Sequence, residues 1–116
     1  MINFDNPLSS ISITNSVFFG NLADVVGCIY AYQNQGILYL QNNTFINNSG
    51  FTRRKVGIGS AAVLQISGLF AEVISVSNLY FQNIAEYSGT IGIYYGILNE
   101  SYSQFIGKNN FGKSKF

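Results

Sequence analysis

One pattern of hydrophobic and polar positions occurs three times along the chain, at residues 11–23, 38–49 and 74–85. In each copy two apolar residues alternate with polar ones, an Asn follows shortly afterwards, and a Phe and a further Asn come next. Alternation with a period of two is typical of β-strands, and the Asn interrupts it where a strand would end. The pattern therefore predicts short strands joined by Asn corners.

A second element follows each copy. A glycine leads into another short apolar alternation, at Gly27, Gly59 and Gly89. Frequent β-branched and aromatic residues favour strands, while the recurring Gly and Asn disfavour long helices. An antiparallel sandwich is the main rival fold, but the sequence lacks the Asn-Gly and Asp-Gly pairs that signal hairpins most strongly. A repeat of roughly 25–35 residues with about three short strands instead predicts a solenoid.

We therefore predict an all-β chain folded as a parallel β-helix, a solenoid of about three to four coils. In such a fold equivalent side chains of successive coils stack at a spacing of about 4.8 Å. An inward Asn can bond to the Asn above it, forming an asparagine ladder, and stacked Phe rings can fill the lumen. The predicted columns are Asn15, Asn42 and Asn78; Phe19, Phe45 and Phe81; and Gly27, Gly59 and Gly89.

The extent of the repeat predicts the organisation of the chain. Residues 1–10 are expected to form a lead-in or partial first coil, residues 11–100 the coils, and residues 101–116 a partial last coil and a tail. A basic insertion near 50–57 interrupts the second unit, and it contains Arg53, Arg54 and Lys55. Because surface loops between strands tolerate insertions, we expect these three residues to project and to be candidates for contact with an anion or a partner.

Composition limits the functions to consider. The chain has 116 residues, which fit one domain, with a net charge of +1 and 9% charged residues, against about 25% in an average soluble domain. This charge gives no strong field for nucleic acid, and no apolar run reaches the roughly 18 residues that suggest a membrane span. A largely neutral surface suits a chain that is glycosylated or covered by neighbouring subunits.

Groups that carry chemistry are sparse. The sequence has no His, so its single cysteine, Cys28, lacks the usual activating base and is expected to be a small core residue. The five acids are scattered and form no Asp-x-Asp motif or adjacent pair; they are Asp5, Asp24, Glu72, Glu86 and Glu100. We therefore predict no metal site, no cofactor and no enzymatic activity, because calcium sites and acid–base pairs need clustered carboxylates.

Three Asn-x-Ser/Thr sequons are candidate glycosylation sites, at Asn42, Asn47 and Asn99. Asn42 and Asn47 are also expected at inward or corner positions, where a glycan would not fit. Asn99 lies in a predicted turn and is therefore the best acceptor of the three.

The repeated elements carry a family resemblance. In this chain Phe18-Phe19-Gly20-Asn21 precedes Val26-Gly27-Cys28-Ile29, Phe45-Ile46-Asn47-Asn48 precedes Gly59-Ser60-Ala61-Ala62, and Phe81-Gln82-Asn83 precedes Ser88-Gly89-Thr90-Ile91. Across roughly residues 11–95 the chain resembles right-handed parallel β-helix proteins of the pectin-lyase-like superfamily. More narrowly, it resembles polymorphic outer membrane protein repeats and related large surface proteins of protists, which pair Phe-x-x-Asn with Gly-Gly-Ala-Ile. The third unit is one residue short of the first element, and no unit has the complete second one.

The resemblance implies a structural or adhesive module at a cell surface or outside the cell, within a larger assembly. A coil leaves unpaired strand edges at both ends, so we expect further coils or other protein subunits to cover them, with glycans as further candidate ligands. Because many β-helix proteins act on polysaccharides, the alternative is a carbohydrate-binding module or a polysaccharide lyase or hydrolase. Converging carboxylates or an exposed aromatic strip beside Arg53–Lys55 would distinguish these alternatives.

Overall fold

The computed structural model describes residues 2–5, 10–24, 26–32, 36–50, 61–85, 89–107 and 111–113. Within these ranges the chain forms sixteen strands and no helix. The strands are β1 (Ile2–Asp5), β2 (Ile11–Thr14), β3 (Val17–Phe19), β4 (Leu22–Ala23), β5 (Ile29–Tyr32), β6 (Ile37–Gln41), β7 (Thr44–Ile46), β8 (Ser49–Gly50), β9 (Leu64–Ser67), β10 (Glu72–Val76), β11 (Leu79–Phe81), β12 (Ile84–Ala85), β13 (Ile91–Ile93), β14 (Ile97–Ser101), β15 (Gln104–Ile106) and β16 (Phe111–Lys113). The prediction of an all-β chain is confirmed.

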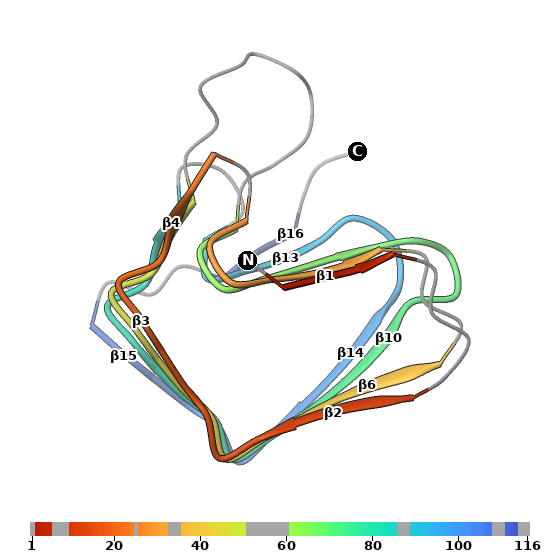
Figure 1. Ribbon diagram of the computed structural model, residues 1–116, viewed down its shortest axis with the longest axis horizontal. Helices are drawn as coiled ribbons and strands as arrows, with labels where there is room; N and C mark the ends of the chain where they lie inside the picture. The colour runs from red at the N-terminus through yellow and green to blue at the C-terminus, as the bar shows by residue number, and fades with distance from the viewer. Residues whose placement is uncertain are drawn as a thin grey trace.

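The strands assemble into four sheets in which every described pairing is parallel. Sheet A has the order β1-β5-β9-β13-β16, sheet B β14-β10-β6-β2, sheet C β15-β11-β7-β3, and sheet D β12-β8-β4. The chain passes through B, C, D and A and then returns to B beside the strand it left, so that successive repeats lie one behind another (Figure 1). This stacking of parallel strands is compatible with a parallel β-helix.

The length of each repeat follows from hydrogen bonds between equivalent corners. Ser16 and Asn43 are 27 residues apart, Asn43 and Asn78 are 35 apart, and Asn78 and Ser103 are 25 apart. The longest of these separations, from Asn43 to Asn78, includes the predicted basic insertion. Arg53, Arg54 and Lys55 lie outside the described residues, as does Gly59.

Two left-handed corners in each repeat turn the chain from one sheet to the next. Between sheets B and C, φ is 52° at Asn15, 54° at Asn42, 55° at Ser77 and 56° at Tyr102. Between sheets C and D, the aligned positions are Gly20 (66°), Asn47 (52°), Gln82 (53°) and Gly107 (85°). Asn and Gly enter this region most readily because a bulkier side chain crowds the backbone there. Asn thus marks the corners at positions 15, 42 and 47, whereas Ser77 and Gln82 hold the corners of the third copy.

The lumen enclosed by the sheets is filled with side chains. Leu38, Leu40, Ile29, Leu64 and Val73 are among its fully buried residues. An aromatic column runs through it: Phe18 stacks on Phe45 (ring centroids 4.8 Å apart), Phe45 on Tyr80 (5.1 Å) and Tyr80 on Phe105 (4.5 Å). Fully burying one large apolar side chain stabilises a fold by about 1.5–3 kcal/mol, so this column is a main source of cohesion between repeats.

The predicted aromatic column Phe19, Phe45 and Phe81 is wrong in two of its three members. Phe45 faces the lumen, but Phe19 is 67% exposed and aligned with Ile46 and Phe81 on the outer face of sheet C. The inward positions in those repeats belong to Phe18 and Tyr80. Side chains alternate between the two faces of a strand, so an alignment shifted by one residue places a side chain on the wrong face.

The predicted glycine column is displaced by one residue at Gly89. Gly27 is aligned with Ala62, because Val26 pairs with Ala61 and the Gly27 N–H donates to Ala61 O. The Ala62 N–H donates to Gly89 O in the same way, which places Gly89 level with Ala61, one position earlier. A Cβ added at Gly27 would collide with the Ala62 carbonyl oxygen. Close approach of the backbones therefore accounts for glycine at position 27.

Candidate functional site

Polar side chains enter the lumen in two ladders at the corners. At the corner between sheets B and C, the Asn43 side-chain oxygen accepts the Ser16 N–H (3.0 Å), and the Asn78 oxygen accepts the Asn43 N–H (2.8 Å). Asn78 in turn donates its own N–H to Ser103 Oγ (3.0 Å). The predicted ladder Asn15, Asn42 and Asn78 is therefore wrong in two of its three members: Asn15 and Asn42 are exposed corner residues, and the ladder positions beside them are Ser16 and Asn43. Asn78 belongs to the ladder.

The second ladder, at the corner between sheets C and D, was missed in the sequence. Asn48 is fully buried, and its oxygen accepts the Asn21 N–H (3.0 Å) and Asn21 Nδ2 (2.9 Å). Its Nδ2 donates to Phe18 O (3.0 Å) and to Asn83 Oδ1 (2.9 Å). The signal that could have identified this ladder is the Asn that recurs three residues after each inward aromatic, at 21, 48 and 83.

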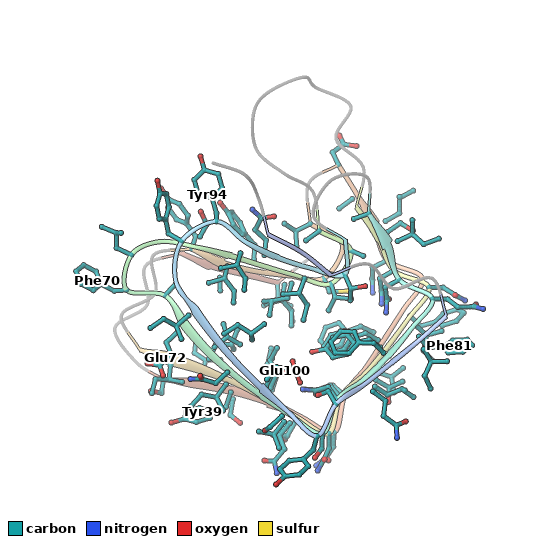
Figure 2. The ribbon with its side chains drawn as sticks, turned by 180° about the vertical axis from the view of Figure 1, so that it is seen from behind. Tyr39, Phe70, Glu72, Phe81, Tyr94 and Glu100 are labelled. Atoms are coloured by element: carbon teal, nitrogen blue, oxygen red, sulfur yellow. The ribbon has the colours of Figure 1, made fainter. Side chains whose placement is uncertain are left out.

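Glu100 is the exceptional polar residue of the lumen. It lies on β14, where it is aligned with Ser75 on β10, and Ser75 is aligned with Leu40 and Leu40 with Ile13. Its side chain points inward beside the aromatic column, whereas Phe81, Tyr39 and Glu72 lie on the outside (Figure 2). Both carboxylate oxygens are shielded from solvent and make no hydrogen bond of good geometry among the described residues.

Three hydroxyl groups lie close to this carboxylate. Burial raises the pKa of Glu100, while the neighbouring Ser103, Ser75 and Tyr80 hydroxyls act in the opposite direction by favouring its charged form. Burial, and secondly the Glu100 charge, raise the pKa of Tyr80, so its hydroxyl remains a donor at neutral pH. Ser75 Oγ lies 3.1 Å from Tyr80 Oη and accepts Asn78 Nδ2 at 2.7 Å. We define Ser75, Asn78, Tyr80, Glu100 and Ser103 as the Glu100 cluster.

The Glu100 cluster lies at an open end of the sheets. Strand β14 ends sheet B and β15 ends sheet C, and no described strand pairs with their outer edges. Phe105, the last described ring of the aromatic column, is 38% exposed, and Ile97 on β14 and Ile106 on β15 are also exposed. At the opposite end, no described strand pairs with the outer edges of β2 and β3. The candidate site is therefore the C-terminal edge formed by β14 and β15 together with the Glu100 cluster beneath it.

The remaining predicted residues have other settings. Cys28 is buried, and its burial raises the pKa of the thiol to about 12, so it stays protonated and unreactive at neutral pH. The three sequon residues Asn42, Asn47 and Asn99 are all exposed, and Asn99 lies within β14 and not in the predicted turn. Asn42 and Asn47 are therefore not too enclosed for a glycan, contrary to the prediction, because the inward residues are their neighbours Asn43 and Asn48.

The described residues give no sign of a metal centre or a membrane helix. In these ranges no three His, Cys, Asp or Glu side chains come together in a way that could hold a metal ion. The described part of the chain also contains no helix with the length and hydropathy needed to cross a bilayer.

Comparison with known proteins gives no match: no family profile, no curated protein and no solved structure is significantly similar to the chain. The all-β architecture with parallel sheets is therefore established by the structure alone. The resemblance to the pectin-lyase-like superfamily stays a prediction.

Proposed function

We propose that the chain is a right-handed parallel β-helix that serves as a structural or adhesive segment of a larger surface or extracellular assembly. The chain acts by binding at its open ends, where another layer of parallel strands extends the sheets. The observation that carries this proposal is that no described strand pairs with the outer edges of β14 and β15, over a lumen in which Phe105, the last described ring of the aromatic column, is 38% exposed.

The path of the chain supports the right-handed sense. In Figure 1 the chain runs from β2 to β3 and β4 and then back across the top, which is clockwise, while it recedes from the viewer. About 98% of crossover connections between parallel strands of one sheet are right-handed. Each return from one strand of sheet B to the next is a connection of this kind.

Bonds between repeats support an added layer at the C-terminal edge. Within the fold, a corner N–H donates to a side-chain oxygen of the next repeat, as Ser16 and Asn43 do. In the described part no such oxygen lies beyond Ser103. Unpaired strand edges readily template pairing with another chain, and an added layer would also cover Phe105 and Ile106. Covering these side chains would stabilise the contact, because burial of apolar surface contributes about 25 cal/mol per Å².

The surface location is supported by composition. Charged residues make up only 9% of the chain, which suits a molecule whose ends are covered by neighbours. All three sequon asparagines are exposed, so each is sterically open to glycosylation during secretion.

The proposal is tested by titrating the ¹⁵N-labelled chain with a synthetic peptide that has the sequence of residues 37–49, the strand–corner–strand unit of one repeat. We expect chemical-shift changes at the amides of residues 97–106, with slower hydrogen exchange at Leu98 and Glu100 as the edge becomes paired. Phe105→Lys should abolish the changes at this end. The matched control is Tyr102→Asn, which removes an exposed aromatic next to the same edge but leaves the lumen intact.

Two results would refute end-to-end contact. One is the absence of shift changes with every peptide of this unit, whichever residue it carries at position 40, and the other is changes that survive Phe105→Lys. Changes on addition of oligosaccharides, centred on the tyrosine pairs Tyr30/Tyr32 and Tyr94/Tyr95, would instead support the carbohydrate-binding alternative.

A further inference from the structure

The following inference rests on the proposed end-to-end contact and specifies the partner. We infer that Glu100 selects the coil that docks on β14 and β15: it accepts a parallel coil of another segment that places a hydrogen-bond donor over the carboxylate, and it rejects a second copy of this chain. The selection depends on Glu100 because it is the acidic member of a column of aligned lumen residues.

The column shows what normally lies over this position. Ile13, Leu40, Ser75 and Glu100 are successive members, each aligned with the next in sheet B. Leu40 and Ser75 are fully buried, because each is covered by the repeats on both sides. A coil laid on β14 would cover Glu100 in the same way, so the residue that it places there decides whether the carboxylate has a partner.

The described neighbours supply few hydrogens to the carboxylate. An ionised carboxylate has about four acceptor positions. Ser75 and Tyr80 have one hydroxyl hydrogen each, and their mutual contact at 3.1 Å uses one of them. Asn78 Nδ2 donates to Ser75 Oγ and to Leu40 O, and Ser103 Oγ donates to Ser101 O at 3.5 Å. The cluster therefore leaves acceptor positions of Glu100 for a donor from the incoming coil.

A leucine over Glu100, as at position 40 within the fold, would enclose the carboxylate without giving it a hydrogen bond. Burying a charged group without a partner is strongly unfavourable. An asparagine has nearly the volume of leucine and adds an N–H₂ donor, so it fills the same space and satisfies the carboxylate. An aspartate of the same size would place a second negative charge beside the first.

A second copy of the chain fits poorly for two reasons. If its β2 continued sheet B on β14 in the same register, its Ile13 would cover Glu100. Its β1 would then need a place in sheet A one layer before its own β5. That layer of sheet A is already occupied by β16, which pairs with β13. A second copy would thus place an apolar residue over the carboxylate, and its β1 would compete with β16 for the same position in sheet A.

The test uses three peptides with the sequence of residues 37–49: the natural one, and the L40N and L40D variants, all with the same solubilising tag. Binding at the C-terminal edge is followed through the amides of Ile97 and Ile106. We expect the L40N peptide to bind about 10-fold more tightly than the natural peptide, which corresponds to one hydrogen bond to a charged group. The L40D peptide should bind most weakly.

The matched chain variant is Glu100→Leu, which restores the residue type found one column position earlier at Leu40 and should fold normally. It should reverse the preference, so that the natural peptide binds more tightly than L40N. Equal binding of natural and L40N peptides, or a preference for L40N that survives Glu100→Leu, would overturn the inference and leave end-to-end contact intact. Failure of all three peptides to bind either form of the chain would refute the proposed function itself.

Discussion

Replacing Asn48 by alanine should destabilise the fold more than any single change at an exposed corner. Asn48 is fully buried and its side chain takes part in four hydrogen bonds, to Asn21 N, Asn21 Nδ2, Phe18 O and Asn83 Oδ1. A typical hydrogen bond contributes about 1 kcal/mol net, and a buried polar group left unpaired costs about 1–3 kcal/mol. We therefore expect a loss of about 4 kcal/mol in the free energy of unfolding.

This loss is large on the scale of a domain of this size. Total stabilities are about 5–15 kcal/mol, and about 1 kcal/mol corresponds to roughly 4 °C in Tm for a chain of this length. We predict that Asn48→Ala lowers Tm by about 15 °C, measured by circular dichroism and checked by urea unfolding. The midpoint should fall with little change in the urea m-value, because the surface exposed on unfolding is nearly the same.

The neighbouring Asn47 provides the matched control. Its side chain is exposed, and its backbone has φ of 52°, which glycine adopts freely. Asn47→Gly should change stability by less than about 0.5 kcal/mol. Equal effects of the two substitutions, or a larger effect at Asn47, would refute the assignment of the inward Asn and with it the register of sheets C and D.

Three further predictions follow from the corners, the lumen and the thiol. Ser77→Asn should stabilise the fold by about 0.5–1 kcal/mol in urea unfolding, because Ser77 has φ of 55° and Asn tolerates this region better; a loss of stability would contradict the strained corner. Glu100→Gln should raise Tm at pH 7 and remove a pH dependence of the wild type. The native pKa of Glu100 is raised above its ordinary value of 4.5, so the stabilising neutral form is complete below pH 4.5 and is lost as pH rises through the native pKa; equal Tm–pH curves for the two proteins would contradict this. Cys28 should resist a thiol reagent at pH 8 in the native protein and react fully in urea, since burial raises its pKa to about 12; rapid native labelling would place the thiol outside the core.

The stacking of the repeats could be predicted because it depends on composition and spacing that all three copies share. Alternating apolar residues, an Asn at or beside a corner and a glycine recur in every copy. This recurrence can be recognised without knowing the exact register or the residue at each position. The parallel sheets and the left-handed Asn corners at positions 15, 42 and 47 follow from it. The register could not be fixed in the same way, because a shift of one residue changes which side chains face the lumen.

The errors arose where residue identity and residue position disagree. Phe81 matches Phe45 by residue type, but the lumen position in that repeat is held by Tyr80, whose hydroxyl is accommodated because Ser75 Oγ lies 3.1 Å away. The Asn42-Asn43 and Asn47-Asn48 pairs are ambiguous in sequence. In the structure the first residue of each pair has a positive φ and is exposed, and the second is buried in a ladder.

The sequence does not distinguish Glu100 from the other acids for a related reason. Among five scattered acids it has no distinctive motif, and its role depends on the inward phase that it shares with Leu98 on β14. Once the register is known, its alignment with Ser75, Leu40 and Ile13 identifies it. A search for acids in the apolar phase of a repeat, rather than for acid pairs, would have found it.

The central claim is that successive repeats lie parallel, with Phe18, Phe45, Tyr80 and Phe105 in one column. Its most direct test is a nuclear Overhauser measurement on protein with labelled aromatic rings and backbone. The account predicts ring contacts between Phe45 and Tyr80 and between Tyr80 and Phe105, together with the Hα–HN pattern of parallel strands between β6 and β10. Ring contacts that join Phe45 to Phe81, or strong Hα–Hα contacts between β6 and β10, would contradict it.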